Sequence, residues 1–274
     1  MQGSGIWSPP TGTLGRIVAE AETRVQALRG SASKLQDAAR QAAHPRRSLE
    51  AALRRETVAV IAEVKRRSPS KGWIAQGLST VDQARAYEAG GAAAISVLTE
   101  PNHFDGSVAD LDAVAAAVNV PVLKKDFHID PIQLVEARAH GATAALLIAR
   151  ALAPDRLEAM LEAARWMTLE AIVEIRDEHE LRRALDAGAG IIGINNRDLE
   201  TLVIDPATSE RLLPLIPSSV IAIAESGMGS VADVERVASF GADAVLVGSS
   251  LSASGDPAAM VARLSTVRRK GRDT

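Results

Sequence analysis

Residues 230–249 read SVADVERVASFGADAVLVGS, and this stretch contains one complete unit of the fold. Ser230 begins a segment whose apolar residues recur at helical spacing, which predicts a helix with a serine N-cap. The segment stops at Gly241, the residue type that most often ends a helix. The apolar run AVLV follows at once and predicts a buried strand. A helix that leads directly into a buried strand is typical of parallel sheets covered by helices.

The same unit recurs along the chain. A helix-ending glycine, an alanine and an apolar run also occur in GGAAAISVL (90–98), GATAALLIA (141–149) and GAGIIGIN (188–195). Four more short apolar runs lie between these units: VAVIAEV (58–64), VPVLKK (120–125), AIVEI (171–175) and VIAIAE (220–225). Eight strands that alternate with helices predict a (β/α)8 TIM barrel. The competing fold is a doubly wound open sheet, which usually has fewer strands and a glycine-rich turn that this chain lacks.

Length and local pattern indicate one domain. The chain has 274 residues, a length at which α/β barrels form a single domain. Residues 1–12 are predicted to be a flexible tail, and 13–274 a single barrel domain in which 13–56 form a helical extension. This extension could cap the bottom of the barrel, lie over its mouth or pack on its side. The closing VRRKGRDT (267–274) is expected to be a solvated end.

Charge and residue usage exclude several classes of protein. The net charge is −3 and no Lys/Arg stripe with interleaved aromatic residues is present, so we expect no nucleic-acid partner. The absence of cysteine excludes disulfides, thiolate nucleophiles and zinc–thiolate sites. No signal peptide and no apolar run of membrane-spanning length is visible. We therefore expect a cytoplasmic protein that does not enter a membrane and is a monomer or weak homo-oligomer.

Polar residues interrupt the predicted strands near their C-terminal ends. Side chains alternate along a strand, so Glu63 and Lys65 share a face that points into the barrel mouth. Other strands end in the same way, with Lys125, Glu174, Asn195, and Glu225 followed by Ser226. Catalytic residues of such barrels come from the C-terminal ends of several strands. One such residue is most simply a solvated terminus or an ion pair, but six that converge on one face predict a catalytic site.

A phosphate site is predicted at one side of the mouth. AESGM (224–228) follows the seventh strand and VGSSL (247–251) the eighth, and each places Gly and Ser where backbone N–H groups can face an anion. The Ser-Pro-Ser of RRSPSKG, after the first strand, is expected to close this site, because the first strand neighbours the eighth. No metal site is predicted, since a loop with a solvated His128 is the simpler interpretation of DFHID (126–130).

The stretch VIAEVKRRSPSKG (60–72) resembles the signature of the indole-3-glycerol-phosphate synthase family. Other segments agree with this family in order and spacing: SVLTEPNHFDGS (96–107), PVLKKDFHID (121–130), ALLIARAL (145–152), IVEIRDEHEL (172–181), IGINNRDLET (192–201), AIAESGM (222–228) and VLVGSSL (245–251). The resemblance is specific, because related phosphate-binding barrels share the fold without the Glu-x-Lys and Ser-Pro-Ser arrangement. The helices before the barrel resemble the extra N-terminal segment of the family.

The resemblance implies a carboxy-lyase of tryptophan biosynthesis that needs no metal or organic cofactor. Its small-molecule substrate would be 1-(2-carboxyphenylamino)-1-deoxyribulose 5-phosphate, which loses carbon dioxide and water to give indole-3-glycerol phosphate. Lys125 would be the general acid, Glu174 and Glu63 would serve later proton transfers, and Lys65 would bind the substrate carboxylate. A second, proton-donating role of Lys65 stays open.

The resemblance also implies binding residues around the catalytic ones. Asn195 and Glu225 would hold sugar hydroxyls or position the charged groups, with Ser226 next to them. The phosphate would be bound by Ser68, Gly227, Gly248 and Ser249. The aromatic ring would be enclosed by Phe104, Phe127, Leu146 and Leu199.

Two other functions fit the residues when the resemblance is set aside. A Schiff-base aldolase acting on a phosphorylated sugar would use Lys125 or Lys65 as its nucleophile. A non-catalytic scaffold is the other class. A chain that had lost catalysis would be expected to lose the charged strand ends, and all of them are present.

Overall fold

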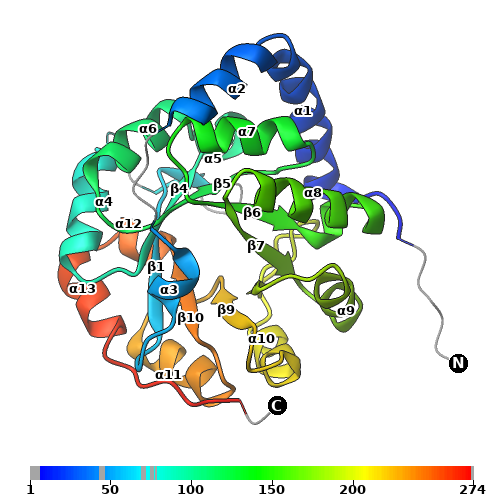
Figure 1. Cartoon of the computed structure of the whole chain (residues 1–274). Coiled ribbons are helices and arrows are strands. Elements are labelled where there is room, and N and C mark those ends of the chain that lie inside the picture. The colour runs from blue at the N-terminus through cyan, green and yellow to red at the C-terminus, as the bar shows by residue number, and fades with distance from the viewer. Residues whose placement is uncertain (1–6, 43–46, 69–71, 75–76, 78, 273–274) are drawn as a thin grey trace, which may run out of the picture.

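A closed barrel of eight parallel strands forms the centre of the molecule (Figure 1). The computed structural model describes residues 7–42, 47–68, 72–74, 77 and 79–272. The barrel strands are β1 (Ala59–Val64), β4 (Ala94–Leu98), β5 (Val122–Lys125), β6 (Ala144–Ile148), β7 (Glu170–Ile175), β8 (Ile191–Asn195), β9 (Ile221–Glu225) and β10 (Ala244–Val247). Each strand pairs in parallel with the next, and β10 pairs with β1 to close the ring. The predicted (β/α)8 barrel is therefore confirmed, and the open sheet is excluded.

An outer helix follows each barrel strand. These helices are α4 (Thr80–Ala89), α6 (Val108–Ala117), α7 (Pro131–Ala139), α8 (Pro154–Trp166), α9 (Glu178–Asp186), α10 (Ala207–Leu212), α11 (Val231–Ser239) and α13 (Pro257–Leu264). Shorter elements lie in the connections: β2 (Arg67–Ser68), β3 (Gly72–Trp73), α5 (Pro101–Phe104), η1 (Ala149–Ala151), η2 (Leu213–Leu215) and α12 (Ser249–Ser252). Ser79, Asp130, Asp177 and Ser230 each accept a hydrogen bond from a backbone N–H of the first helical turn, as the capping pattern predicts.

Side chains on the strands alternate between the barrel lumen and the outer helices. On β1, Ala59 and Ile61 belong to the lumen cluster, whereas Val60, Ala62 and Val64 pack in the cluster under the helices. Burial on both faces explains why these strands are continuously apolar. The polar residues at the C-terminal ends of the strands continue the lumen face and therefore lie at the barrel mouth.

The N-terminal extension consists of three helices, α1 (Gly12–Arg29), α2 (Ala32–Gln41) and α3 (Leu49–Leu53). Thr13 and Ile17 of α1 line a cavity at the barrel mouth. Ala39 of α2 belongs to a cluster with Ile132 and Val135 of α7, on the side of the barrel. The first two helices thus cover two different parts of the same barrel.

The third helix closes the opposite end of the barrel. Leu49 and Leu53 join the lumen cluster. Glu170, the first residue of β7, accepts a hydrogen bond of 2.9 Å from the backbone N–H of Glu50. In Figure 1, α3 lies inside the ring of outer helices. The three placements that the sequence left open are therefore all occupied, each by a different helix.

Before α1, the chain runs along the barrel near η1. The indole Nε1 of Trp7 donates a hydrogen bond of 3.3 Å to the backbone oxygen of Arg150. Of the residues predicted to form a flexible tail, 1–6 lie outside the described residues.

The C-terminal segment contradicts the prediction of a solvated end. The Arg272 side chain is only 4% exposed, and its Nη2 lies 2.8 Å from Oδ2 of Asp243. Arg269 forms a second ion pair with the same buried carboxylate, whose Oδ2 also accepts a hydrogen bond from the backbone N–H of Ala222. Arg269 and Arg272 therefore neutralise a buried aspartate beside β10. The sequence prediction failed because nothing local to the segment indicates this partner.

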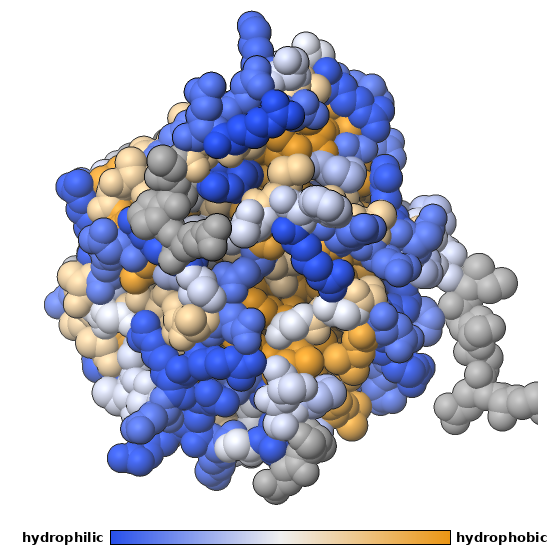
Figure 2. All heavy atoms as spheres, in the orientation of Figure 1, coloured by the Kyte–Doolittle hydropathy of each residue, from blue (hydrophilic) through white to orange (hydrophobic). Residues whose placement is uncertain are grey.

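One face of the molecule differs in hydropathy between its rim and its centre. Figure 2 shows mainly hydrophilic side chains around the rim of this face and hydrophobic ones toward its centre. Within the described part of the chain, no helix combines the length and the apolar character needed to span a bilayer.

Candidate active site

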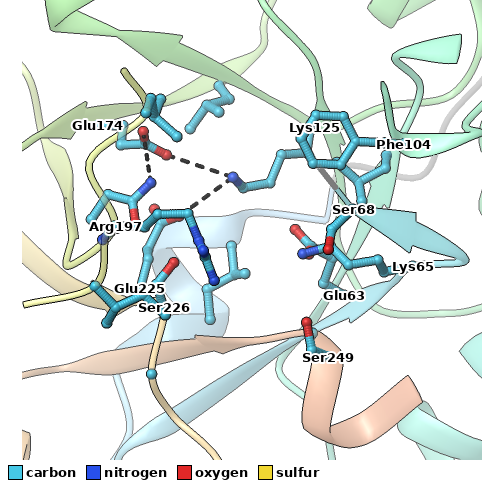
Figure 3. Close-up of a pocket in the computed structure, with 18 of the residues that line it drawn as sticks. Glu63, Lys65, Ser68, Phe104, Lys125, Glu174, Arg197, Glu225, Ser226 and Ser249 are labelled. Atoms are coloured by element: carbon cyan, nitrogen blue, oxygen red, sulfur yellow. Dashed lines mark hydrogen bonds and ion pairs between the residues drawn. The ribbon is translucent and has the colours of Figure 1, made fainter. Parts of the chain in front are cut away.

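A cavity of about 330 Å³ opens at the C-terminal ends of the barrel strands. This volume is in the range of sites that enclose a small molecule. The cavity lining includes every site residue predicted from the sequence: Glu63, Lys65, Ser68, Phe104, Lys125, Phe127, Leu146, Glu174, Asn195, Leu199, Glu225, Ser226, Gly227, Gly248 and Ser249. Figure 3 shows that several of these side chains point toward one another.

The ammonium group of Lys125 lies between two buried carboxylates. Its Nζ is 3.5 Å from Oε2 of Glu174 and 3.5 Å from Oε2 of Glu225, and both glutamates are nearly inaccessible to solvent (Figure 3). Asn195 donates a hydrogen bond of 3.1 Å from Nδ2 to Oε1 of Glu174, which fixes that carboxylate from the other side. Four strands, β5, β7, β8 and β9, thus supply one connected polar group.

These carboxylates determine the charge of Lys125. Burial acts to lower the pKa of Lys125, but Glu225, Glu174 and Glu63 outweigh it and raise the pKa above its ordinary value. Burial raises the pKa of Glu225 above the usual carboxyl range; Lys125 opposes this effect, and Glu174 and Glu63 add to it. Lys125 is therefore held as an ammonium, the form that can donate a proton.

A second charged pair lies on β1 and just after it. Nζ of Lys65 is 2.6 Å from Oε1 of Glu63, and the Lys65 side chain is 16% exposed while Glu63 is buried. Burial acts to raise the pKa of Glu63, but the ammonium groups of Lys65 and Lys125 lower it below its ordinary value. Figure 3 shows this pair on a different side of the pocket from Glu174 and Arg197. Lys65 is thus a partly accessible cation, whereas Glu63 is a buried anion.

The turns after β9 and β10 form the glycine-rich part of the cavity. Ser226 and Gly227 both have left-handed φ angles, 64° and 82°, in the turn after β9. Gly248 precedes the short α12, which begins at Ser249. Ser68 lines the same cavity from β2, while Pro69 and Ser70 of the predicted Ser-Pro-Ser wall lie outside the described residues. Closely spaced backbone N–H groups in such turns are suited to an anion.

Apolar side chains form another wall of the cavity. The rings of Phe104, on α5, and Phe127, after β5, have centroids 6.3 Å apart and are tilted by 34°. Leu146 of β6 is buried among the lumen residues, and Leu199 packs against the same cluster. An aromatic ring can be enclosed between these side chains, close to the polar group around Lys125.

Arg197 is a cavity residue that the sequence analysis did not single out. Its backbone N–H donates a hydrogen bond of 2.9 Å to Oδ1 of Asn195, and its Nη1 donates one of 3.0 Å to the Leu202 oxygen. Burial lowers the pKa of Arg197. The sequence prediction stopped at Asn195, the last residue of the strand. The available signal was the run NNR, which places an arginine two residues beyond a predicted site residue.

The prediction of a solvated His128 in DFHID is wrong. His128 is 1% exposed, and its Nδ1 lies 2.8 Å from the Leu146 oxygen. Burial lowers the pKa of His128 to about 3, so the ring is neutral. Asp126 instead forms an ion pair of 2.9 Å with Arg24 of α1. The polar residues of this run thus contact different elements of the fold: Asp126 contacts α1, and His128 contacts β6.

Glu20, Glu100 and His103 are a further group of side chains close enough to share a metal ion. The Glu100 carboxylate accepts hydrogen bonds from the backbone N–H groups at the start of α5. Glu20 lies 3.1 Å from Nε2 of His103 and accepts a hydrogen bond from Asn102. These contacts explain the cluster as a junction between α1 and α5.

The sequence matches the family model described as indole-3-glycerol phosphate synthase over residues 14–264. The chain belongs to this family. The indole-3-glycerol phosphate synthase of Parafrankia sp. is 49% identical over 249 residues, which cover 91% of this chain and 90% of that relative. The one from Mycolicibacterium vanbaalenii is 54% identical over 216 residues, 79% of each chain. The one from Rhodococcus jostii is 50% identical over 227 residues, 83% of this chain and 84% of that relative.

Membership of the indole-3-glycerol phosphate synthase family confirms the resemblance inferred from the strand-end motifs, and with it the enzyme class, a carboxy-lyase. Among solved structures, thiamine phosphate pyrophosphorylase from Pyrococcus furiosus matches with a TM-score of 0.59 at 15% identity. The match covers 76% of this chain and 94% of that one. At this identity the likeness concerns the barrel fold alone.

Proposed function

We propose that the cavity binds 1-(2-carboxyphenylamino)-1-deoxyribulose 5-phosphate and converts it to indole-3-glycerol phosphate, carbon dioxide and water. The observation that carries this proposal is the Lys125 ammonium, 3.5 Å from each of two buried carboxylates at the C-terminal ends of the strands. Family membership supports the choice of substrate.

Lys125 is the general acid of the ring closure. The ring carbon that bears the carboxylate attacks the ketone carbon of the sugar chain, while Lys125 gives a proton to the ketone oxygen. An ammonium next to an oxygen that gains negative charge lowers the barrier of such a step. The carboxylate then leaves as carbon dioxide, and the electrons of its bond restore the aromatic ring.

Dehydration completes the indole. A proton leaves the new five-membered ring, and the hydroxyl formed in the first step leaves as water after it is protonated. Glu174, Glu63 and Lys65 supply the acid and base of this step. Their different surroundings support a division of roles, because Glu63 is buried against a cation while Lys65 is partly exposed.

The substrate is flexible, so the site must hold both of its ends. The turns with Gly227, Gly248 and Ser249 bind the phosphate, together with Ser68. Lys65 binds the carboxylate, and Arg197 provides a second cation for an anionic or hydroxyl group. Fixing the two ends brings the ring carbon and the ketone together. Binding thereby removes a large part of the entropic cost of orienting these two groups during the reaction.

The charge state of Lys125 argues against a Schiff-base aldolase. A Schiff base forms from a neutral amine, and amines used in this way have lowered pKa values. The pKa of Lys125 is raised instead, because three carboxylates face it. Proton donation is the chemistry that this environment favours.

The direct test is to incubate the purified chain with the carboxyphenylamino substrate. We expect indole fluorescence to appear with release of one carbon dioxide per product. Treatment with borohydride during turnover should leave the protein mass unchanged. A lack of indole product, or a substrate covalently trapped on a lysine, would contradict the proposed reaction.

We also propose that the chain works in the cytoplasm as a monomer or weak homo-oligomer, without a nucleic-acid partner. A sequence pI near 6.0 and the absence of cysteine support this proposal. Light scattering during size-exclusion chromatography, over a range of concentrations, tests the oligomeric state. A stable oligomer at the lowest concentration would contradict it.

A further inference from the structure

Gly193 lies on the strand between the two carboxylates that face Lys125. Glu174 of β7 is the register partner of Gly193, and Glu225 of β9 is the register partner of Asn195. Ile191 of the same strand belongs to the lumen cluster, so residues two and four positions later, Gly193 and Asn195, also face the lumen. Gly193 is therefore the position at which β8 could place a side chain between Glu174 and Glu225.

The space next to Gly193 is filled by Glu225. A β-carbon added at this glycine would overlap Oε1 of Glu225, and it would lie 3.3 Å from Cδ of the same carboxylate. It would also come within 3.1 Å of Cγ2 of Ile172 on β7. The main collision is thus with the end of a flexible side chain and not with backbone. A side chain at position 193 would displace the carboxylate of Glu225 while the barrel stays closed.

Backbone conformation does not explain why this residue is glycine. Gly193 lies inside β8, and it is not among the described glycines with left-handed φ angles. A glycine inside a strand weakens the strand and often marks a close approach of another group. Here the group that approaches is the carboxylate of Glu225.

We propose that Gly193 is a positioning residue of the active site: its missing side chain leaves the gap through which Glu225 reaches Lys125 from one side of β8 while Glu174 reaches it from the other. This inference rests on the proposed function. It concerns where the carboxylates stand and not the identity of the substrate.

A second glycine, Gly248, leaves room for a buried glutamate in the same way. A β-carbon at Gly248, just after β10, would lie 2.6 Å from Oε1 of Glu63 and 3.3 Å from its Cδ. Glu63 is on β1, which pairs with β10. Two of the three buried glutamates of the site thus extend over a glycine of the adjoining strand. Gly248 also lines the proposed phosphate site, so Gly193 is the cleaner position for an experiment.

Moving Glu225 changes the charges around the general acid. Lys125 of β5, Glu174 of β7 and Glu63 of β1 are the charged groups that face Glu225. A carboxylate pushed away from Gly193 would lie at different distances from these three groups. The pKa values of the whole group would therefore change. The chemical step should respond more strongly than substrate binding, because the atoms nearest to a β-carbon at Gly193 belong to Glu225 and Ile172 and not to the residues assigned to the phosphate or the aromatic wall.

The test compares Gly193→Ala with Gly190→Ala. Gly190 precedes the same strand, and a β-carbon there meets no atom within 4 Å. We expect Gly193→Ala to lower kcat about tenfold or more, to change KM by less than about threefold and to displace the pH profile of kcat. Gly190→Ala should behave as the unmodified enzyme. A Gly193→Ala variant with unchanged kcat and pH profile would overturn the proposal.

A thermal-stability comparison separates this inference from the proposed reaction, because it needs no turnover. If Gly193 makes room for Glu225, Gly193→Ala should lower Tm in the unmodified chain but have little effect in a Glu225→Ala background. Equal shifts of Tm in both backgrounds would overturn the positioning role. This result can be read even if the carboxyphenylamino compound is not converted, or if Gly193→Ala alone folds poorly.

Discussion

Nζ of Lys125 lies 3.5 Å from Oε2 of Glu225, and this contact joins the last residues of two strands that are not neighbours in the barrel. The lysine is kept charged by the carboxylates around it, and its pKa is raised in consequence. Glu225 is a carboxylate in a place where burial disfavours its charge. The protonation state of Lys125 therefore depends on the charge of Glu225, and that of Glu225 depends on the charge of Lys125.

Replacing Lys125 by Ala should abolish most of the catalytic step. We expect kcat to fall about 10²-fold or more, because loss of a general acid typically has an effect of this size. KM should change less, because the phosphate and carboxylate contacts are on other strands. Steady-state assays by indole fluorescence, with a thermal melt to verify folding, measure this. Normal turnover by the variant would show that another group is the acid.

Replacing the serines of the phosphate site should weaken binding more than chemistry. Ser68→Ala and Ser249→Ala remove hydroxyl groups that line the glycine-rich part of the cavity. We expect each variant, and more strongly the double variant, to raise KM at nearly unchanged kcat. Inhibition by inorganic phosphate should weaken in parallel. An unchanged KM in the double variant would place the phosphate elsewhere.

Arg197 offers a test of the residue that sequence reasoning missed. Its side chain lines the cavity, so Arg197→Ala should raise KM by roughly tenfold or more through loss of a charge-assisted hydrogen bond to the substrate. Arg182 is an exposed arginine on α9 and serves as the control, because Arg182→Ala should leave KM unchanged. Equal kinetics of the two variants would exclude Arg197 from substrate binding.

Several parts of the site follow directly from the sequence. Alternation along β1 places Glu63 on the inner face, and the eightfold repeat places Lys125, Glu174 and Glu225 at one end of the barrel. Both inferences use periods fixed by covalent geometry. Contacts between side chains from distant strands are different, because they depend on barrel closure and on rotamers. The distances from Lys125 to its two carboxylates could not be read from any local pattern.

The two wrong predictions from the sequence, a solvated His128 and a solvated C-terminal segment, have the same physical origin. His128 and Arg272 are polar residues in segments that look solvated, and both are buried by partners far away in the sequence. His128 contacts the Leu146 oxygen on β6, and Arg272 contacts Asp243 beside β10. A histidine or an arginine in a loop is usually exposed, so only the tertiary contact reveals the exception.

Arg272 should matter for stability although it lies two residues before the last residue of the sequence. Arg272→Ala leaves the buried Asp243 with Arg269 as its remaining ion-pair partner and should lower the free energy of unfolding by about 2 kcal/mol, the size of a lost hydrogen bond to a charged group. Lys270→Ala changes an exposed neighbour in the same segment and should have almost no effect. Urea unfolding of both variants compares them. Equal stabilities would mean that the segment is solvated after all.

Glu180 should make stability depend on pH near neutrality. It is a buried residue of α9, and burial together with the charge of Asp177 raises its pKa to about 7 from an ordinary 4.5. The folded protein thus binds this proton more tightly than the unfolded chain does. Ionising Glu180 therefore costs stability, with no cost below about pH 4.5 and the full cost above about pH 7.

Glu180→Gln removes this cost and keeps the acceptor for the backbone N–H of Arg176, which lies 2.7 Å from the carboxylate. We expect the variant to be more stable than the unmodified chain by at most about 3 kcal/mol above pH 7, since one pKa unit corresponds to about 1.4 kcal/mol. The difference should shrink as pH falls from 7 to 4.5. Glu178→Gln, an exposed neighbour on the same helix, should show no such trend in urea titrations across this range. A constant difference for Glu180→Gln at all pH values would mean that its carboxyl group does not titrate there.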